Sequence, residues 1–160
     1  MQVIEGDIIA VARAHAKDRR SACLVHQTNC QRIAGAGLAK QIRDTFPRWW
    51  AFYRTDIFNT PGRATECWVE DPHGYPNGGL FVVNLYAQVG IGRGVQTDYA
   101  RFESALQDLK RLPICGYATM QVFVPFGIGC GLAGGDWSVI LPLLEHYVPN
   151  ATLVKLPTRK

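Results

Sequence analysis

Hydrophobic residues recur along this chain with two spacings, which predict strands that alternate with helices. Short apolar runs rich in β-branched residues, such as 120–126, are typical of buried strands. Apolar residues three and four positions apart, such as Ile8, Val11 and Ala12, indicate helices. The alternation predicts an α/β fold, a three-layer α/β/α sandwich with a mixed, mostly parallel six-stranded sheet. Strands are expected at residues 1–5, 22–27, 65–70, 80–87, 120–126 and 151–156, and helices at 8–16, 38–46, 47–57, 97–111 and 137–147.

Turn and cap residues mark where several of these elements begin and end. Residues 71–79 are rich in Pro, Gly and Asn, and they separate two strands that we expect to form a hairpin. Asp7 and Asp136 each stand directly before a predicted helix, where a carboxylate can accept from free backbone N–H groups. The helix at 47–57 carries an aromatic surface that we expect in the core, made of Trp49, Trp50, Phe52 and Tyr53.

Length and composition narrow the class of protein. The chain has 160 residues, 48% of them hydrophobic, so we expect one domain over residues 1–160. No apolar run approaches the length of about 20 residues that a membrane span requires, and the start lacks the pattern of a signal peptide. Five cysteines without a CxxC pair argue against a disulfide framework or a zinc site. We therefore expect a cytoplasmic monomer without a metal or cofactor, whose net charge of +4 fits a phosphorylated ligand better than nucleic acid.

The stretch Val124–Trp137 places glycines where a strand ends and a helix begins. Backbone N–H groups in such a loop, near the positive end of a helix, form a site for phosphate or diphosphate. The alternative is a connection that only turns the chain. A dinucleotide fingerprint is disfavoured, because only one helix and one strand follow, and residues 151–156 contain no carboxylate. The glycines of this stretch are Gly127, Gly129, Gly131, Gly134 and Gly135.

A second loop has the same character. The strand at 22–27 runs into residues 28–37, which end with Gly35-Ala36-Gly37 at the start of the next helix. In open α/β sheets, ligands bind beyond the carboxyl ends of the strands. Two such loops predict a cleft with backbone N–H groups on both walls.

Taken together, these motifs resemble those of the macro domain, a fold that binds ADP-ribose. The resemblance covers nearly the whole chain and rests on Gly6-Asp7-Ile8, on His26–Cys30 followed by Gly35-Ala36-Gly37, and on Gly127–Leu132. The pattern is most similar to the branch that holds the ADP-ribose-1''-phosphate phosphatases and the human terminal ADP-ribose glycohydrolase. Similar chains also occur in bacteriophages.

The resemblance implies a role for each motif. Asp7 would accept a hydrogen bond from the adenine amino group beside the backbone of Ile8, and Asn29 would hold the distal ribose. The two loops would enclose the diphosphate. The implied ligand site comprises Asp7, Ile8, Asn29, Cys30, Gly35, Ala36, Gly37, Gly127, Ile128, Gly129, Cys130, Gly131 and Leu132, with His26 and Asn29 as candidate catalytic residues.

Known catalytic groups of related hydrolases are missing at the matching positions. Ala39 and Ala133 stand where two of those branches carry an aspartate, and residues 80–87 contain no lysine. His26 remains as a possible acid or base, and Cys30 as a less favoured nucleophile. The alternative for His26 is a structural role, and the alternative for Cys30 is a buried, unreactive thiol.

Three functions follow from the resemblance. The first is hydrolysis of an ADP-ribose derivative at the distal ribose, with ADP-ribose 1''-phosphate as the preferred substrate. The second is removal of ADP-ribose from a modified protein or nucleic acid. The third is a module that binds ADP-ribose without turnover.

Overall fold

The computed structural model describes residues 1–160 except 18–19, 72–77, 117–119 and 159–160. The described strands form one sheet in the order β1-β6-β5-β2-β4-β3. All neighbouring pairs are parallel except β3 with β4, which confirms the mixed sheet and the antiparallel pairing expected of the hairpin. Most of the turn predicted at residues 71–79 lies outside the described residues. The elements are β1 Gln2–Glu5, α1 Ile8–Ala16, β2 Ser21–Asn29, α2 Gly37–Thr45, α3 Pro47–Thr55, β3 Ala64–Glu70, β4 Gly79–Gln88, α4 Tyr99–Leu109, the 3-10 helix η1 Pro113–Gly116, β5 Met120–Pro125, α5 Trp137–Tyr147 and β6 Thr152–Lys155.

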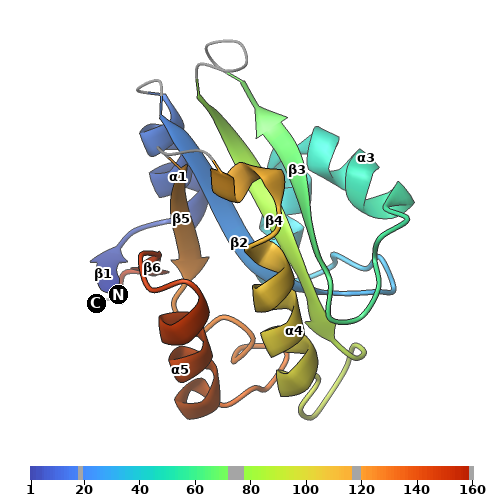
Figure 1. The fold of residues 1–160 in the computed structure, drawn as a ribbon. Coiled ribbons are helices and arrows are strands. Elements are labelled where there is room, and N and C mark those ends of the chain that lie inside the picture. The colour runs from blue at the N-terminus through green and yellow to red at the C-terminus, as the bar shows by residue number, and fades with distance from the viewer. Residues whose placement is uncertain (18–19, 72–77, 117–119, 159–160) are drawn as a thin grey trace.

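Helices cover both faces of the sheet, as the alternating pattern predicts (Figure 1). On one face, Cys23 and Val25 of β2 belong to a core cluster with residues of α4 and α5. On the other, Ala22 and Leu24 join residues of α1, α2 and α3. Successive β2 residues thus face opposite layers, because strand side chains alternate with a period of two.

The aromatic surface of α3 belongs mainly to the second of these layers. Trp49 and Tyr53 are fully buried, whereas Trp50 and Phe52 are half-buried and pack against the same cluster. The Trp49 and Tyr53 rings stack with their centroids 4.7 Å apart. The prediction that this helix faces the core is therefore confirmed.

The neighbouring strands β2 and β4 place the loops that follow them side by side. Strand β2 pairs with β4 along its whole length, and Asn29 at its end lies opposite Gln88. This pairing extends β2 two residues beyond the predicted end at position 27. The carboxyl ends of β2, β4 and β5 point to the same end of the molecule, at the bottom of Figure 1.

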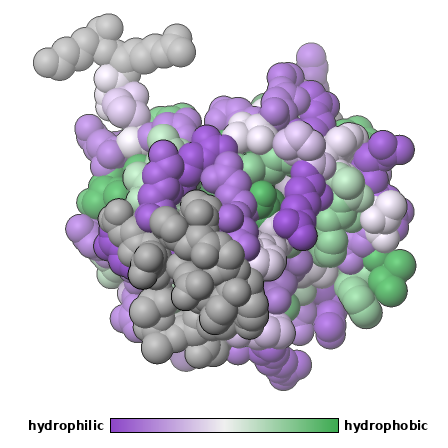
Figure 2. Space-filling model, turned by 90° about the horizontal axis from the view of Figure 1, so that it is seen from above, coloured by the Kyte–Doolittle hydropathy of each residue, from purple (hydrophilic) through white to green (hydrophobic). Residues whose placement is uncertain are grey.

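The two ends of the molecule differ in surface character. Seen from above in Figure 2, the end opposite the carboxyl ends of these strands is largely hydrophilic. At the carboxyl end, several large hydrophobic side chains are exposed, among them Ile33, Ile91 and Leu132. No helix within the described part of the chain is long and apolar enough to cross a membrane.

Candidate functional site

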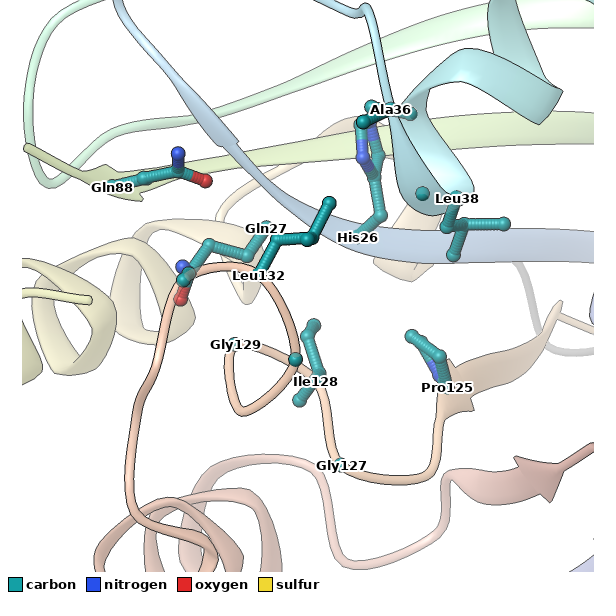
Figure 3. Close-up of a pocket in the computed structure, with 14 residues that line it drawn as sticks. His26, Gln27, Ala36, Leu38, Gln88, Pro125, Gly127, Ile128, Gly129 and Leu132 are labelled. Atoms are coloured by element: carbon teal, nitrogen blue, oxygen red, sulfur yellow. The ribbon is translucent and has the colours of Figure 1, made fainter. Parts of the chain in front are cut away.

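Two adjoining cavities of about 300 and 360 Å³ lie at the carboxyl ends of the central strands. Because both are bounded by several of the same residues, they form one continuous cleft. Figure 3 shows the first cavity between helix α2, strand β2 and the glycine loop. The shared residues are Gln27, Ala36, Ala39, Gln88 and Leu132.

The first wall of the cleft consists of residues 33–39, the end of the β2–α2 loop and the first turn of α2. Helix α2 begins with Ala36 at its N-cap, and no side chain caps its first N–H groups. Gly37 follows with a φ of 57°, a conformation that favours glycine. The positive end of this helix is therefore open toward the cleft.

The second wall consists of the glycine loop, residues 127–133. Gly127 and Gly129 have φ values of 75° and 74°, which tighten the loop into consecutive turns. Within the described part of the chain, no hydrogen bond uses the N–H groups of Gly129, Gly131 or Leu132. These donors lie across the cleft from α2 and are free for an anion.

A short chain of side-chain hydrogen bonds holds the glycine loop in place. The Thr97 hydroxyl donates to the Gly129 carbonyl oxygen over 2.7 Å, so it must accept from Gln27 Nε2, which lies 2.9 Å away. The backbone of Gln96 and Thr97 donates to the Ala133 carbonyl oxygen. The φ of 74° at Gly129 favours glycine, and a Cβ added there would also stand 2.7 Å from Gln27 Oε1.

The helix that follows the glycine loop does not offer its own N-terminus to a ligand. The Asp136 carboxylate accepts from the Ser138 N–H over 2.8 Å and from its hydroxyl over 2.7 Å. Asp136 is thus the N-cap that the sequence predicts, and the bonds from Ser138 lower its pKa. Any anion on this wall would bind the loop, because the cap already satisfies the helix end.

His26 borders the first cavity, yet its ring is almost fully buried. Its Nε2 lies 2.8 Å from Asn84 Oδ1, which also accepts from Trp49 Nε1. His26 Nδ1 is buried and has no partner among the described residues. Burial lowers the pKa of His26 to about 4, so the ring is neutral at neutral pH. The neutral ring keeps only the N–H proton that Nε2 shares with Asn84, and it lacks the imidazolium proton that a general acid would donate.

Asn29 borders the second cavity, but its side chain forms hydrogen bonds within its own loop. Its Oδ1 accepts from the N–H groups of Gln31 and Ile33, and its Nδ2 donates to the Ile33 carbonyl oxygen over 2.9 Å. This pattern closes the turn after β2. Asn29 thus shapes the cavity, and a contact with a ribose would have to share these groups.

The cleft gathers most of the predicted ligand-binding residues. Asp7, Ile8, Cys30 and Cys130 are not among those that line the two cavities. Asp7 is the exposed N-cap of α1 and accepts from the Ala10 N–H over 2.9 Å. Burial raises the pKa of the Cys30 and Cys130 thiols, which disfavours the reactive thiolate. The predicted residues that line the cleft are His26, Asn29, Gly35, Ala36, Gly37, Gly127, Ile128, Gly129, Gly131 and Leu132.

Sequence reasoning missed several residues of the cleft. Gln27 and Gln88 are polar residues near the ends of the neighbouring strands β2 and β4, and that position could have identified them. Ile91 and Gly92 belong to the loop after β4 and line the second cavity. The glycines of residues 88–96 fit a lid over a ligand and a merely flexible surface loop equally well, so the sequence did not assign these two residues to the site.

Comparison with known proteins identifies the fold. No protein-family model and no curated protein matches this chain. A Bacteroides thetaiotaomicron protein of unknown function superposes with a TM-score of 0.77 at 21% identity, over 98% of this chain and 97% of that one. The macrodomain of Mycobacterium tuberculosis DarG superposes with a TM-score of 0.68 at 21% identity, over 99% and 97% of the two chains. The chain has the macrodomain fold.

A further macrodomain neighbour is a solved complex. Thermosipho africanus DarTG, in complex with ADP-ribose, superposes with a TM-score of 0.70 at 17% identity. The match covers all of this chain and 43% of DarTG. The macrodomain fold that the sequence motifs predict is thus confirmed, while identities this low establish the fold alone.

Proposed function

We propose that this chain binds ADP-ribose in the cleft between α2 and the glycine loop. The observation that carries the proposal is the pairing of an uncapped helix N-terminus with unpaired N–H groups across the cleft. Two linked phosphates need donors on both sides, and this arrangement supplies them from the backbone. DarTG, part of which shares this fold, was solved in complex with ADP-ribose, and this supports the choice of ligand.

The shape of the cleft suggests an orientation for the ligand. The adenosine would lie toward Pro125 and Gly127, on the side of the sheet where β1 ends next to Asp7. One Asp7 oxygen caps α1, which leaves the other to accept from the adenine amino group. The distal ribose would lie in the second cavity, beside Asn29 and Ile33.

Isothermal calorimetry with ADP-ribose tests this proposal. We expect saturable binding of ADP-ribose, weaker binding of ADP, which lacks the distal ribose, and no binding of adenosine, which lacks both phosphates. Adenosine bound as tightly as ADP-ribose would show that the backbone donors do not hold the diphosphate. No heat and no change in melting temperature at millimolar ADP-ribose would refute the proposal.

The alternative to binding alone is that the protein also hydrolyses an ADP-ribose derivative at the distal ribose. It requires a group that can act near the anomeric carbon, and His26 is the candidate from the sequence. Its Nε2 is held by Asn84 and its Nδ1 is buried, so neither nitrogen faces open space. The geometry therefore favours capture of ADP-ribose over turnover.

Measuring phosphate release from ADP-ribose 1''-phosphate distinguishes capture of the ligand from hydrolysis. Capture predicts tight binding with no release above a protein-free control. Release that disappears in His26→Asn, with ADP-ribose still bound, would instead establish the phosphatase. Loss of label from an ADP-ribosylated protein or nucleic acid, without phosphate release, would select the ADP-ribosyl hydrolase.

A further inference from the structure

We propose that Arg32 and Asn59 are positioning residues that hold the first wall of the cleft ready for its ligand. This inference rests on the proposed function, because the ligand is the ADP-ribose proposed above. Neither residue is among those that line the two cavities. Both act on residues 29–36, the binding loop, through residues 53–59, which we call the support segment.

Three side chains, those of Tyr53, Asn59 and Arg32, form hydrogen bonds between the support segment and the binding loop. The Tyr53 hydroxyl donates to the Asn29 carbonyl oxygen over 2.7 Å. Asn59 Nδ2 donates to the Cys30 carbonyl oxygen over 3.0 Å. One guanidinium nitrogen of Arg32 donates to the Asp56 carbonyl oxygen over 3.1 Å. The first turn after β2 is thus tied to a segment about 25 residues away in sequence.

The support segment is itself fixed to the core. The buried Asp56 carboxylate accepts from the Phe58 N–H, the Thr65 hydroxyl and the Tyr86 hydroxyl, all within 2.8 Å. Burial raises the pKa of Tyr53 to about 12, so its hydroxyl keeps the proton that it donates. The bonds from Arg32 and Asn59 therefore transmit the rigidity of the sheet to the binding loop.

The binding loop needs this support because its own backbone is disfavoured. Arg32 has a φ of 60° and is the only residue other than glycine with a positive φ in the described part of the chain. A side chain with a Cβ rarely adopts this conformation. Without the contact to Asp56, other conformations of the loop would compete and move Ile33 and Gly35, which line the second cavity.

Substitutions at these two residues test the inference. Arg32 is exposed and Asn59 half-buried, so Asn59→Ala, Arg32→Ala and Arg32→Gly leave the core intact. Thr55→Ala is the matched control, since its hydroxyl donates only to carbonyl oxygens of its own helix. The measurements are the ADP-ribose dissociation constant, the melting temperature, and amide hydrogen exchange across residues 30–36.

We expect Asn59→Ala and Arg32→Ala to weaken ADP-ribose binding about five-fold each, the effect of losing one hydrogen bond. The double variant should weaken binding by more than the product of the two single losses, because after one substitution the other bond still partly holds the loop. Exchange across residues 30–36 should accelerate while the melting temperature stays near that of Thr55→Ala. Arg32→Gly should retain more affinity than Arg32→Ala, because glycine tolerates the positive φ.

Two outcomes would overturn the inference without touching the proposed function. Wild-type affinity and exchange in both alanine variants would show that the loop holds itself. If Arg32→Gly binds ADP-ribose like wild type while Arg32→Ala does not, the Arg32 side chain is not a positioning group, since only the backbone conformation would matter. If wild-type protein fails to bind ADP-ribose, the proposed function falls, and the exchange rates still decide whether these residues fix the loop.

Discussion

Helices α2 and α5 begin at similar places along the chain, but the N-terminus of α5 is capped by a side chain and that of α2 is not. Both follow a glycine-containing loop at the carboxyl end of a central strand. Asp136 caps α5 with its carboxylate, whereas α2 starts at Ala36 with no side-chain acceptor. Helices α1 and α4 also carry aspartate caps, at Asp7 and Asp98. The helix that faces the cleft is thus left without the acceptor that three others have.

Helix α3 also lacks a side-chain cap, but it begins at Pro47 and lines neither cavity, so we propose that the uncapped end of α2 keeps its donors for a ligand. A carboxylate cap stabilises a helix by satisfying its first N–H groups and its positive end, so a capped helix has little left to offer an anion. On the second wall, the unpaired loop N–H groups of Gly129, Gly131 and Leu132 take the place of a helix end. The first wall uses a helix and the second a loop, and each can be tested separately.

The largest effect is expected from capping α2. Ala36→Asp would place a carboxylate where we expect phosphate, and it would occupy the same N–H groups. ADP-ribose binding should weaken at least about 100-fold by calorimetry, through charge repulsion and lost donors. The fold should become more stable by about 1 kcal/mol, as a new N-cap allows. Loss of affinity together with a higher melting temperature cannot be explained by unfolding.

The control for this experiment is Ala51→Asp, which adds the same charge at an exposed position of α3. It should leave the dissociation constant within about two-fold of wild type, since exposed charges more than about 10 Å apart are largely screened. Wild-type affinity in Ala36→Asp would mean that the ligand phosphates do not lie at α2.

The second wall should be most sensitive at Gly129. In Gly129→Val the branched side chain would meet Gln27 Oε1 and Thr97, and a positive φ is strongly disfavoured for valine. We expect ADP-ribose binding to be lost and the melting temperature to fall. Gly131→Ala is the comparison, because a Cβ there meets nothing within 4 Å. If both variants bind like wild type, the glycine loop is not a wall of the site.

The two walls also differ in how far the sequence could predict them. The glycine pattern marks both loops, and Asp136 marks the capped helix, because these signals are local. The partners of His26 are not local, since Asn84 lies 58 positions away and meets it only through the β2–β4 register. The support of the binding loop by Asn59 is equally remote in sequence. Motif spacing thus located the cleft, while burial and hydrogen bonding decided what its side chains can do.

His26 makes the protein sensitive to mild acid. Its pKa is about 4 in the folded protein and about 6.5 when exposed, so the unfolded chain binds the proton first. The free energy of unfolding should fall by about 3 kcal/mol as the pH drops from 6.5 to 4. Urea unfolding at pH 6.5 and pH 4 measures this loss. A similar fall in His26→Asn would assign the sensitivity to other groups.

The smallest effect is expected from removing the cap of α5. Asp136→Ala should lower the melting temperature slightly at pH 7 and leave ADP-ribose affinity unchanged, because the cap serves the helix and not the cleft. The hydrogen bonds from Ser138 lower the pKa of Asp136, so its contribution is present above pH 3.8 and is lost as the pH falls further. The difference from wild type should therefore vanish in strong acid. A clear loss of affinity at pH 7 would instead show that α5 takes part in binding, and the contrast between the two helix ends would no longer hold.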